Sequence, residues 1–69
     1  MRLKDLKPIL YSTVGAIQWA IVYDYERNED IEHGCSIEYA ITHYEEYEVK
    51  RITSYYEVST GNDYLVITI

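Results

Sequence analysis

The stretch Ala16–Tyr25, with the sequence AIQWAIVYDY, decides how this chain folds. Its larger side chains alternate with smaller ones at a period of two, which is the period of a β-strand. The larger set, which we expect to face the core, is Ile17, Trp19, Ile21, Tyr23 and Tyr25. The smaller set is itself half apolar. We therefore expect a central strand.

Two more strands are predicted toward the end of the chain. Tyr47–Val58 is rich in Val, Ile, Thr and Tyr, which pack well on a pleated surface. The segment STGND that follows contains Gly61 and Asn62 and is typical of a hairpin turn. Tyr64–Ile69, YLVITI, is apolar nearly throughout, so it must be paired and covered to avoid aggregation.

Two short segments have helical spacing. Leu3, Leu6 and Leu10 favour a brief helix, which Pro8 limits because its ring disfavours helical geometry at the residue before it. The segment Ser36–Tyr44 fits both periods. Its helical stripe is Ile37, Ala40, Ile41 and Tyr44, and its strand stripe is Ile37, Tyr39, Ile41 and His43. Ser36 as N-cap and Glu38 in the first turn favour the helix, and a strand is the alternative.

These elements predict an α+β fold, with a small antiparallel sheet of three or four strands and one or two short helices on one face. At 69 residues the chain forms a single small domain, residues 1–69. Cys35 is the one cysteine, which excludes an internal disulfide and is typical of an intracellular protein. No apolar run approaches the ~20 residues of a membrane span. We expect a cytoplasmic protein without membrane contact.

The net charge of −6 is concentrated in the middle of the chain. Residues 1–8 are basic overall, whereas residues 24–48 place nine acids against Arg27 alone. Phosphate would repel this region, so no direct binding to nucleic acid is expected. A basic partner would instead be attracted to it.

Within this region the run DYERNEDIE, residues 24–32, carries an acid or Asn28 at every second position. On an EF-hand template it has Glu29 where glycine is needed and Cys35 where a bidentate glutamate is needed, which argues against calcium. The run is typical of a solvated hairpin end. As a functional alternative, carboxylates at i and i+2 of an extended strand lie about 6.6–6.8 Å apart on one face, close to the spacing of a phosphate ladder.

The sequence contains no pattern that indicates catalysis or a cofactor. It lacks a nucleophile elbow and a glycine-rich phosphate loop. His33, Cys35 and His43 are too few for a structural zinc site. We predict a protein that is not an enzyme and that needs no metal or cofactor.

Nine tyrosines and no phenylalanine suggest a thin domain whose rings keep their hydroxyls near water, and a surface suited to protein contacts. We expect two acidic clusters to contact a partner. The first acidic cluster is Asp24, Glu26, Glu29, Asp30 and Glu32, and the second acidic cluster is Glu45, Glu46 and Glu48. The tyrosines predicted to add contact area beside them are Tyr25 and Tyr47.

Taken whole, the chain resembles small acidic accessory proteins of phages and mobile elements of Gram-positive bacteria. The resemblance lies in the opening LKDLKPIL, the strand AIQWAIVYDY, the segment EYAITHY and the ending YLVITI. That group includes anti-CRISPR proteins, several of which are acidic nucleic-acid mimics. The resemblance implies an inhibitor that blocks a basic groove of an effector, and it assigns no functional residue.

The sequence therefore predicts a non-enzymatic acidic binding protein that inhibits or modulates a basic protein or nucleoprotein effector, as an anti-CRISPR-type inhibitor does. The alternative is a structural or assembly protein that forms a homodimer or larger homo-oligomer through an apolar strand.

Overall fold

Seven short elements follow one another along the chain in a computed structural model that describes residues 1–13 and 19–69. They are, in order, η1 (Leu3–Leu6), α1 (Lys7–Thr13), β1 (Trp19–Asp24), β2 (Glu29–Ser36), α2 (Ile37–His43), β3 (Arg51–Glu57) and β4 (Asn62–Thr68). The predicted beginning of the first strand, residues 16–18, lies outside the described residues. No helix within the described ranges is long and apolar enough to cross a membrane.

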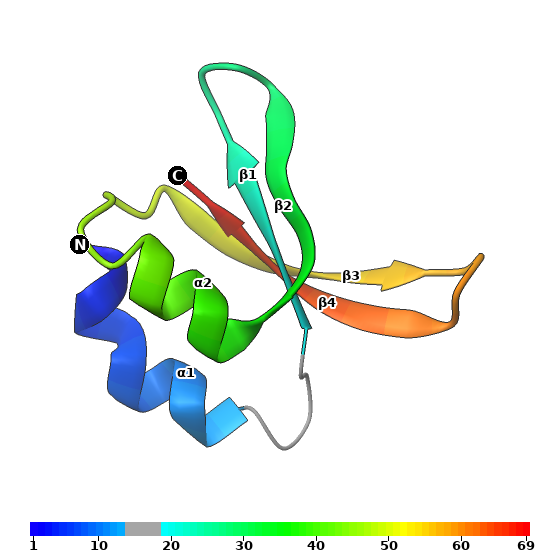
Figure 1. The fold of residues 1–69 in the computed structure, drawn as a ribbon, viewed down its shortest axis with the longest axis horizontal. Coiled ribbons are helices and arrows are strands. Elements are labelled where there is room, and N and C mark those ends of the chain that lie inside the picture. Colours follow the sequence, from blue (N-terminus) through cyan, green and yellow to red (C-terminus); the bar gives the residue numbers. More distant parts are fainter. Residues whose placement is uncertain (14–18) are drawn as a thin grey trace.

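The strands form one sheet in the order β2-β1-β4-β3. β1–β2 and β3–β4 are antiparallel hairpins, and β1 runs parallel to β4 at the centre. Figure 1 shows the two hairpins extending in different directions from this central pair. The predicted small sheet with short helices is confirmed. Its central pair makes it a mixed sheet that is mostly antiparallel.

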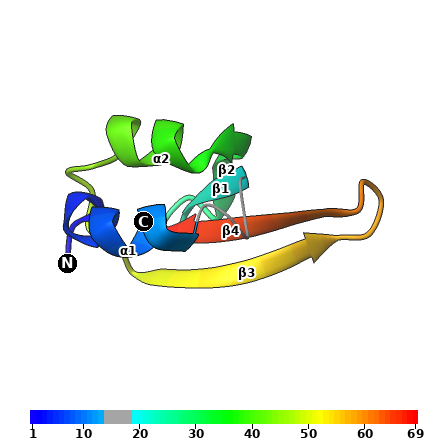
Figure 2. The same ribbon diagram turned by 90° about the horizontal axis from the view of Figure 1, so that it is seen from below.

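α2 covers one face of the sheet, and η1 and α1 close the core beside it (Figure 2). The domain measures 31 × 29 × 17 Å along its principal axes, so it is thin. Side chains from both helical segments meet those of the central strands. The buried residues of this core are Leu3, Leu10, Ala20, Val22, Ile37, Ala40, Ile41, Ile67 and Ile69.

The prediction that the larger side chains of β1 face this core is wrong. Ala20 and Val22 are fully buried there, whereas Trp19 and Tyr25 are 44% and 65% exposed. Small side chains on β1 let the helices pack closely against the strand, and the larger ones occupy the open face. Ile21 is nevertheless buried on that open face. β1 lies between β2 and β4, so the prediction of a central strand is confirmed.

The ambiguous segment 36–44 forms the helix α2. The Ser36 hydroxyl accepts the backbone N–H of Tyr39 at 3.0 Å, which is the predicted N-cap contact. Ile37, Ala40 and Ile41 are buried against the sheet, as the helical stripe predicts.

At the N-terminus the chain forms two short helical elements in succession. Leu3 in η1 is fully buried. Pro8 is the second residue of α1, where the missing N–H needs no intrahelical acceptor. Both elements are brief, as predicted.

The apolar strand β4 is protected on both edges, since β1 and β3 pair with it. The turn before it contains Gly61 at φ 72°, a conformation that favours glycine. Across β3, Tyr55 pairs with Tyr64 and Tyr56 pairs with Asp63. The two adjacent tyrosines therefore point to opposite faces, and both are exposed.

Replacing Ile41 by alanine should lower the free energy of unfolding by about 2–5 kcal/mol, because the side chain is fully buried between α2 and the sheet. Urea denaturation followed by circular dichroism measures this loss. The matched control is Ile9→Ala on an exposed position of α1, expected to change stability by about 0.5 kcal/mol or less. Equal losses in the two variants would contradict this account of the core.

Candidate functional site

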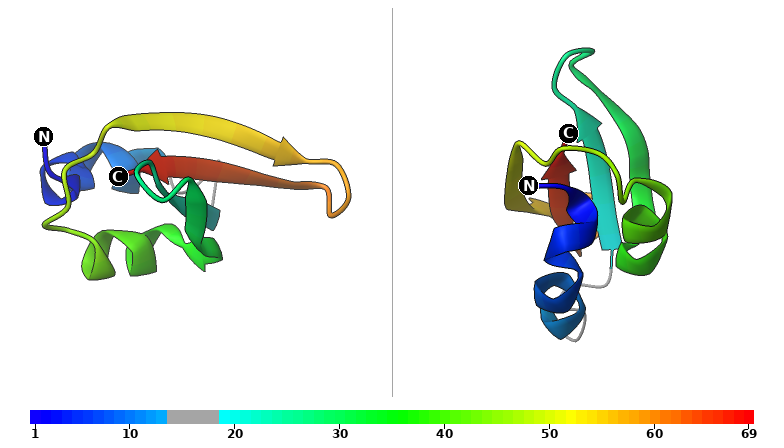
Figure 3. Two further views of the ribbon diagram at one scale, coloured as in Figure 1. Left: turned by 90° about the horizontal axis from the view of Figure 1, so that it is seen from above. Right: turned by 90° about the vertical axis from the view of Figure 1, so that its left-hand side faces the viewer.

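The first acidic cluster begins in the turn between β1 and β2. The Asp24 carboxylate accepts the backbone N–H groups of Glu26 and Arg27 at 3.0 and 3.2 Å. Asn28 has φ 55°, which asparagine tolerates, and its side-chain oxygen accepts the Tyr23 hydroxyl. Asp24 therefore holds the turn in addition to carrying charge. The turn lies at the far end of the β1–β2 hairpin (Figures 1 and 3).

The predicted row of carboxylates along one face of a strand is wrong. Glu26 lies in the turn rather than in a strand. The adjacent residues Val22 and Tyr23 pair with Glu32 and Asp30, because the register shifts at this point. Neighbouring strand residues point to opposite faces, so the bulge sends these two carboxylates to opposite faces of the sheet. These carboxylates therefore do not have the spacing of a phosphate ladder along one face.

Glu32 faces the helix layer and has a partner there. The hydroxyl of Tyr44, just after α2, donates to Glu32 Oε1 at 3.1 Å. Burial of the ring, together with this carboxylate, raises the pKa of Tyr44 to about 12. Glu32 thus joins β2 to α2 within the protein.

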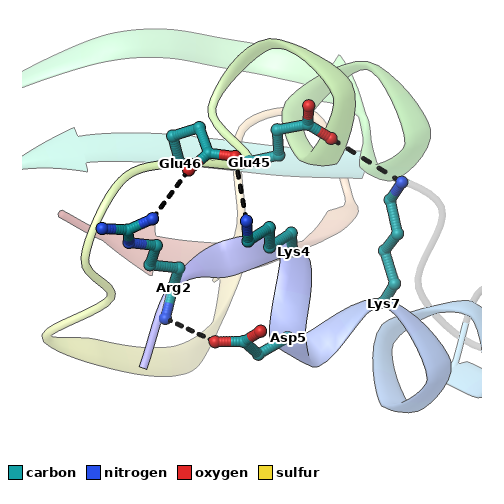
Figure 4. A network of polar contacts seen from close by, with 6 residues as sticks. All are labelled: Arg2, Lys4, Asp5, Lys7, Glu45 and Glu46. Atoms are coloured by element: carbon teal, nitrogen blue, oxygen red, sulfur yellow. Dashed lines mark hydrogen bonds and ion pairs between the residues drawn. The ribbon is translucent and has the colours of Figure 1, made fainter.

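The second acidic cluster is compensated by the basic N-terminal segment, as Figure 4 shows for most of its members. The ion pairs join Arg2 and Lys4 to Glu46 at 2.9 and 3.1 Å, Lys7 to Glu45 at 3.7 Å, and the amino group of Met1 to Glu48 at 2.6 Å. These contacts lower the pKa of Glu46, chiefly through Lys4, and that of Glu48, chiefly through the Met1 amino group.

Backbone contacts fix the same two segments together. The N–H of Leu3 donates to the carbonyl of Tyr47 at 3.0 Å, and the N–H of Val49 donates to the carbonyl of Met1 at 2.9 Å. The segment 45–49 is therefore part of the scaffold. In the sequence, the excess of bases in residues 1–8 is the one indication of this pairing, because it complements the acids of the second acidic cluster.

Parts of both clusters meet at one surface pocket of about 240 Å³. The turn supplies Asp24 and Glu26, and the loop before β3 supplies Tyr47 and Glu48. Lys50 and Ile69 complete the lining. We call these six residues the acid pocket. It has three carboxylates and one tyrosine ring on its wall, contributed by segments far apart in the sequence.

The remaining members of the first cluster lie outside the acid pocket. Glu29 is 3.8 Å from Arg27, and Asp30 contacts His33 at 3.1 Å. Tyr25 lies beside Lys50, whose Nζ is 6.0 Å from the centroid of its ring. Of the predicted partner-binding residues, the acid pocket therefore gathers Asp24 and Glu26 from the first acidic cluster, Glu48 from the second, and Tyr47 beside it.

His33 lies at the centre of a second polar group, on the face that the helices leave open. Its Nδ1 is 3.1 Å from Asp30 Oδ2, and its Nε2 is 3.3 Å from Glu57 Oε2 on β3. Its ring packs on that of the buried Tyr64, with centroids 5.3 Å apart. The carboxylates raise the pKa of His33, with the Asp30 contact as the largest cause. No local pattern in the sequence indicates that Glu57 lies beside His33.

The soft ligands do not form a metal site in the described part of the chain, where no three His, Cys, Asp or Glu side chains are grouped to hold an ion. Cys35 packs against the core, and burial raises the pKa of its thiol. His43 stacks on Tyr39 at the other end of α2.

The chain matches no protein-family model, and no curated protein or solved structure shows significant similarity to it. The resemblance to acidic accessory proteins of the anti-CRISPR kind therefore stays a prediction.

Replacing Tyr44 by phenylalanine should lower the free energy of unfolding by about 1 kcal/mol, because Glu32 loses its hydroxyl donor. Urea denaturation measures the loss. Absorbance titration should show that the wild-type phenol with a pKa of about 12 is missing in the variant. Tyr47→Phe is the control, since no hydroxyl contact of Tyr47 exists among the described residues; a similar loss of stability there would contradict the assignment.

The raised pKa of His33 makes its contribution to stability depend on pH. A folded pKa above the ordinary histidine value of 6.5 means that this contribution is complete below about 6.5 and is lost as the pH rises through the folded pKa. The stability difference between wild type and His33→Gln should therefore shrink from about pH 5.5 to about pH 8.5.

Proton NMR of the His33 ring provides the direct measurement. We expect its midpoint above 6.5, and a larger drop in Asp30→Asn than in Glu57→Gln, because Asp30 is the main cause of the shift. A wild-type midpoint at or below 6.5 would show that the two carboxylates do not stabilise the charged ring.

Proposed function

We propose that this protein is a non-enzymatic acidic binding protein that inhibits or modulates a basic, nucleic-acid-handling partner, as an anti-CRISPR-type inhibitor does. The observation that carries the proposal is the acid pocket. It combines carboxylates and an aromatic ring from the two regions that the sequence predicts to contact a partner.

The distribution of charge supports this choice of surface. Bases of the N-terminal segment compensate the second acidic cluster, so that cluster contributes little net field. In the turn, by contrast, Arg27 is the one base that forms ion pairs with Asp24 and Glu29 among the described residues, at 3.8 Å from each. The acids of the β1–β2 turn therefore outnumber the base that pairs with them, and this charge would attract a basic surface.

The composition of the acid pocket suits an arginine or lysine side chain. Carboxylates such as those of Asp24 and Glu26 accept hydrogen bonds from a guanidinium, and a ring such as that of Tyr47 offers it a face. Lys50 already shows that a cation is tolerated at this position. A partner with a basic groove would present several such side chains.

Assembly through an apolar strand is the alternative function. The most apolar strand, β4, has β1 and β3 on its two edges, so it has no free edge for another copy. An assembly function would have to use an edge strand.

The double variant Glu26→Lys/Glu29→Lys should abolish capture of the partner, because it reverses two exposed charges, one in the turn and one at the start of β2, without removing the Asp24 contacts. The measurement is a pull-down from bacterial lysate with immobilised protein, quantified by mass spectrometry. Raising the salt from about 0.1 M to about 1 M should release the partner, since the Debye length falls from about 10 Å to about 3 Å. Captured nucleic-acid-binding proteins, RNA-guided nucleases included, are then assayed for inhibition.

The matched control is Glu38→Lys/Asp63→Lys, which makes the same change in net charge on α2 and at the far end of β4. We expect it to retain the partner. Equal loss in both double variants would show that net charge alone is responsible. Undiminished capture by the turn variant would exclude the acid pocket and its turn as the binding surface.

A further inference from the structure

The two edge strands of the sheet differ in how they are protected. β2 carries Glu29, Asp30 and Glu32, and its pairing with β1 shifts register twice. Gly34 within it has φ 88°. Charges, bulges and irregular backbone are the devices that keep an edge strand from pairing with another chain.

β3 has none of these devices along its central part. Five consecutive residues, Ile52–Tyr56, are uncharged, and the strand contains no proline. It pairs with β4 in an unbroken register along its whole length. Four of the five residues are exposed. β3 forms the outer edge of the sheet, and Figure 2 shows it on the side away from α2.

We propose that β3 pairs antiparallel with β3 of a second copy of this chain, joining two sheets into one of eight strands. The proposal goes beyond the proposed binding function and rests on the β3 edge alone. In an antiparallel pair, directly opposite residues have their side chains on the same face of the sheet. A twofold axis between two copies of the strand therefore passes midway between the two copies of one residue.

The charges at the ends of β3 select the register. With the axis at Ser54, Arg51 of each copy lies opposite Glu57 of the other. With the axis at Thr53 or Tyr55, Glu57 lies opposite Val49 or Thr53 instead, and both charges lack a partner. The Ser54 register also pairs all seven residues of β3.

The other cross-strand pairs of this register are favourable as well. Ile52 lies opposite Tyr56, and Thr53 lies opposite Tyr55, which are pairs of a β-branched with an aromatic residue. Two serines meet at the axis. Arg51 has no carboxylate partner among the described residues, and Glu57 is reached by His33 from the β2 side. The dimer does not extend into a longer assembly, because the two edges of the eight-stranded sheet are then formed by the protected β2 strands.

Sedimentation velocity between about 10 and 500 µM tests the proposal, because dimerisation depends on concentration. Wild type should shift from monomer to dimer. Ser54→Lys places like charges opposite each other at the axis and should weaken the dimer by about tenfold or more. Ser59→Lys, the same substitution in the turn beyond β3, should leave the dimer unchanged.

Charge reversal at the strand ends tests the register. Arg51→Glu and Glu57→Arg should each weaken self-association, because each creates like-charged pairs. An equimolar mixture of the two variants should form a heterodimer in native mass spectrometry, since every pair in it again joins an acid to a base.

A wild type that stays monomeric up to about 500 µM would overturn the proposal. So would a dimer that Ser54→Lys does not affect, or a mixture that forms no heterodimer while its components remain folded by circular dichroism. The turn variant Glu26→Lys/Glu29→Lys should dimerise normally, so failure of one proposal leaves the other standing.

Discussion

The parallel pairing of β1 with β4 is the constraint on which the rest of the structure depends. Hydrogen bonds between the Tyr25 N–H and the Ile69 carbonyl, and between the Ile69 N–H and the Tyr23 carbonyl, carry the pairing beyond the strands. Parallel neighbours cannot be joined by a tight turn, so the chain must cross over between them. Here the crossover consists of β2, α2 and β3. It lays α2 against β1 and β2 and leaves β2 and β3 as edges.

Local patterns were sufficient to predict the helices and three of the four strands, but neither β2 nor the arrangement of the elements. Ser36 and the stripe behind it predicted α2, because capping and helical periodicity act within a few residues. The face of β1 that meets the helices was predicted wrongly. Side-chain size along a strand does not reveal which face a helix will cover, and Ala20 packs there because its small side chain allows close approach. The parallel pair was missed because it joins residues from opposite ends of the chain.

The same limit applied to the candidate site. Charge counting located the acids, and the fold then gave them different roles. Glu32 was predicted to face a partner, but its contact with Tyr44 depends on α2 packing over β2. Glu46 is paired with Arg2 and Lys4, more than 40 residues away along the chain. The acid pocket itself arises because the crossover brings the loop after α2 back beside the turn after β1.

The tyrosine content follows from the thinness of the sheet. Of the eight tyrosines whose side chains are described, Tyr64 alone is buried, under His33 on the open face. A ring on a sheet with one helix layer lies near water, so a hydroxyl costs little and phenylalanine offers no advantage.

The central parallel pair also separates the two hairpins by character: acids gather on β1–β2, and uncharged residues on β3. An acidic binding surface and a self-pairing edge, as proposed, would then use opposite edges of one sheet without competing for the same backbone.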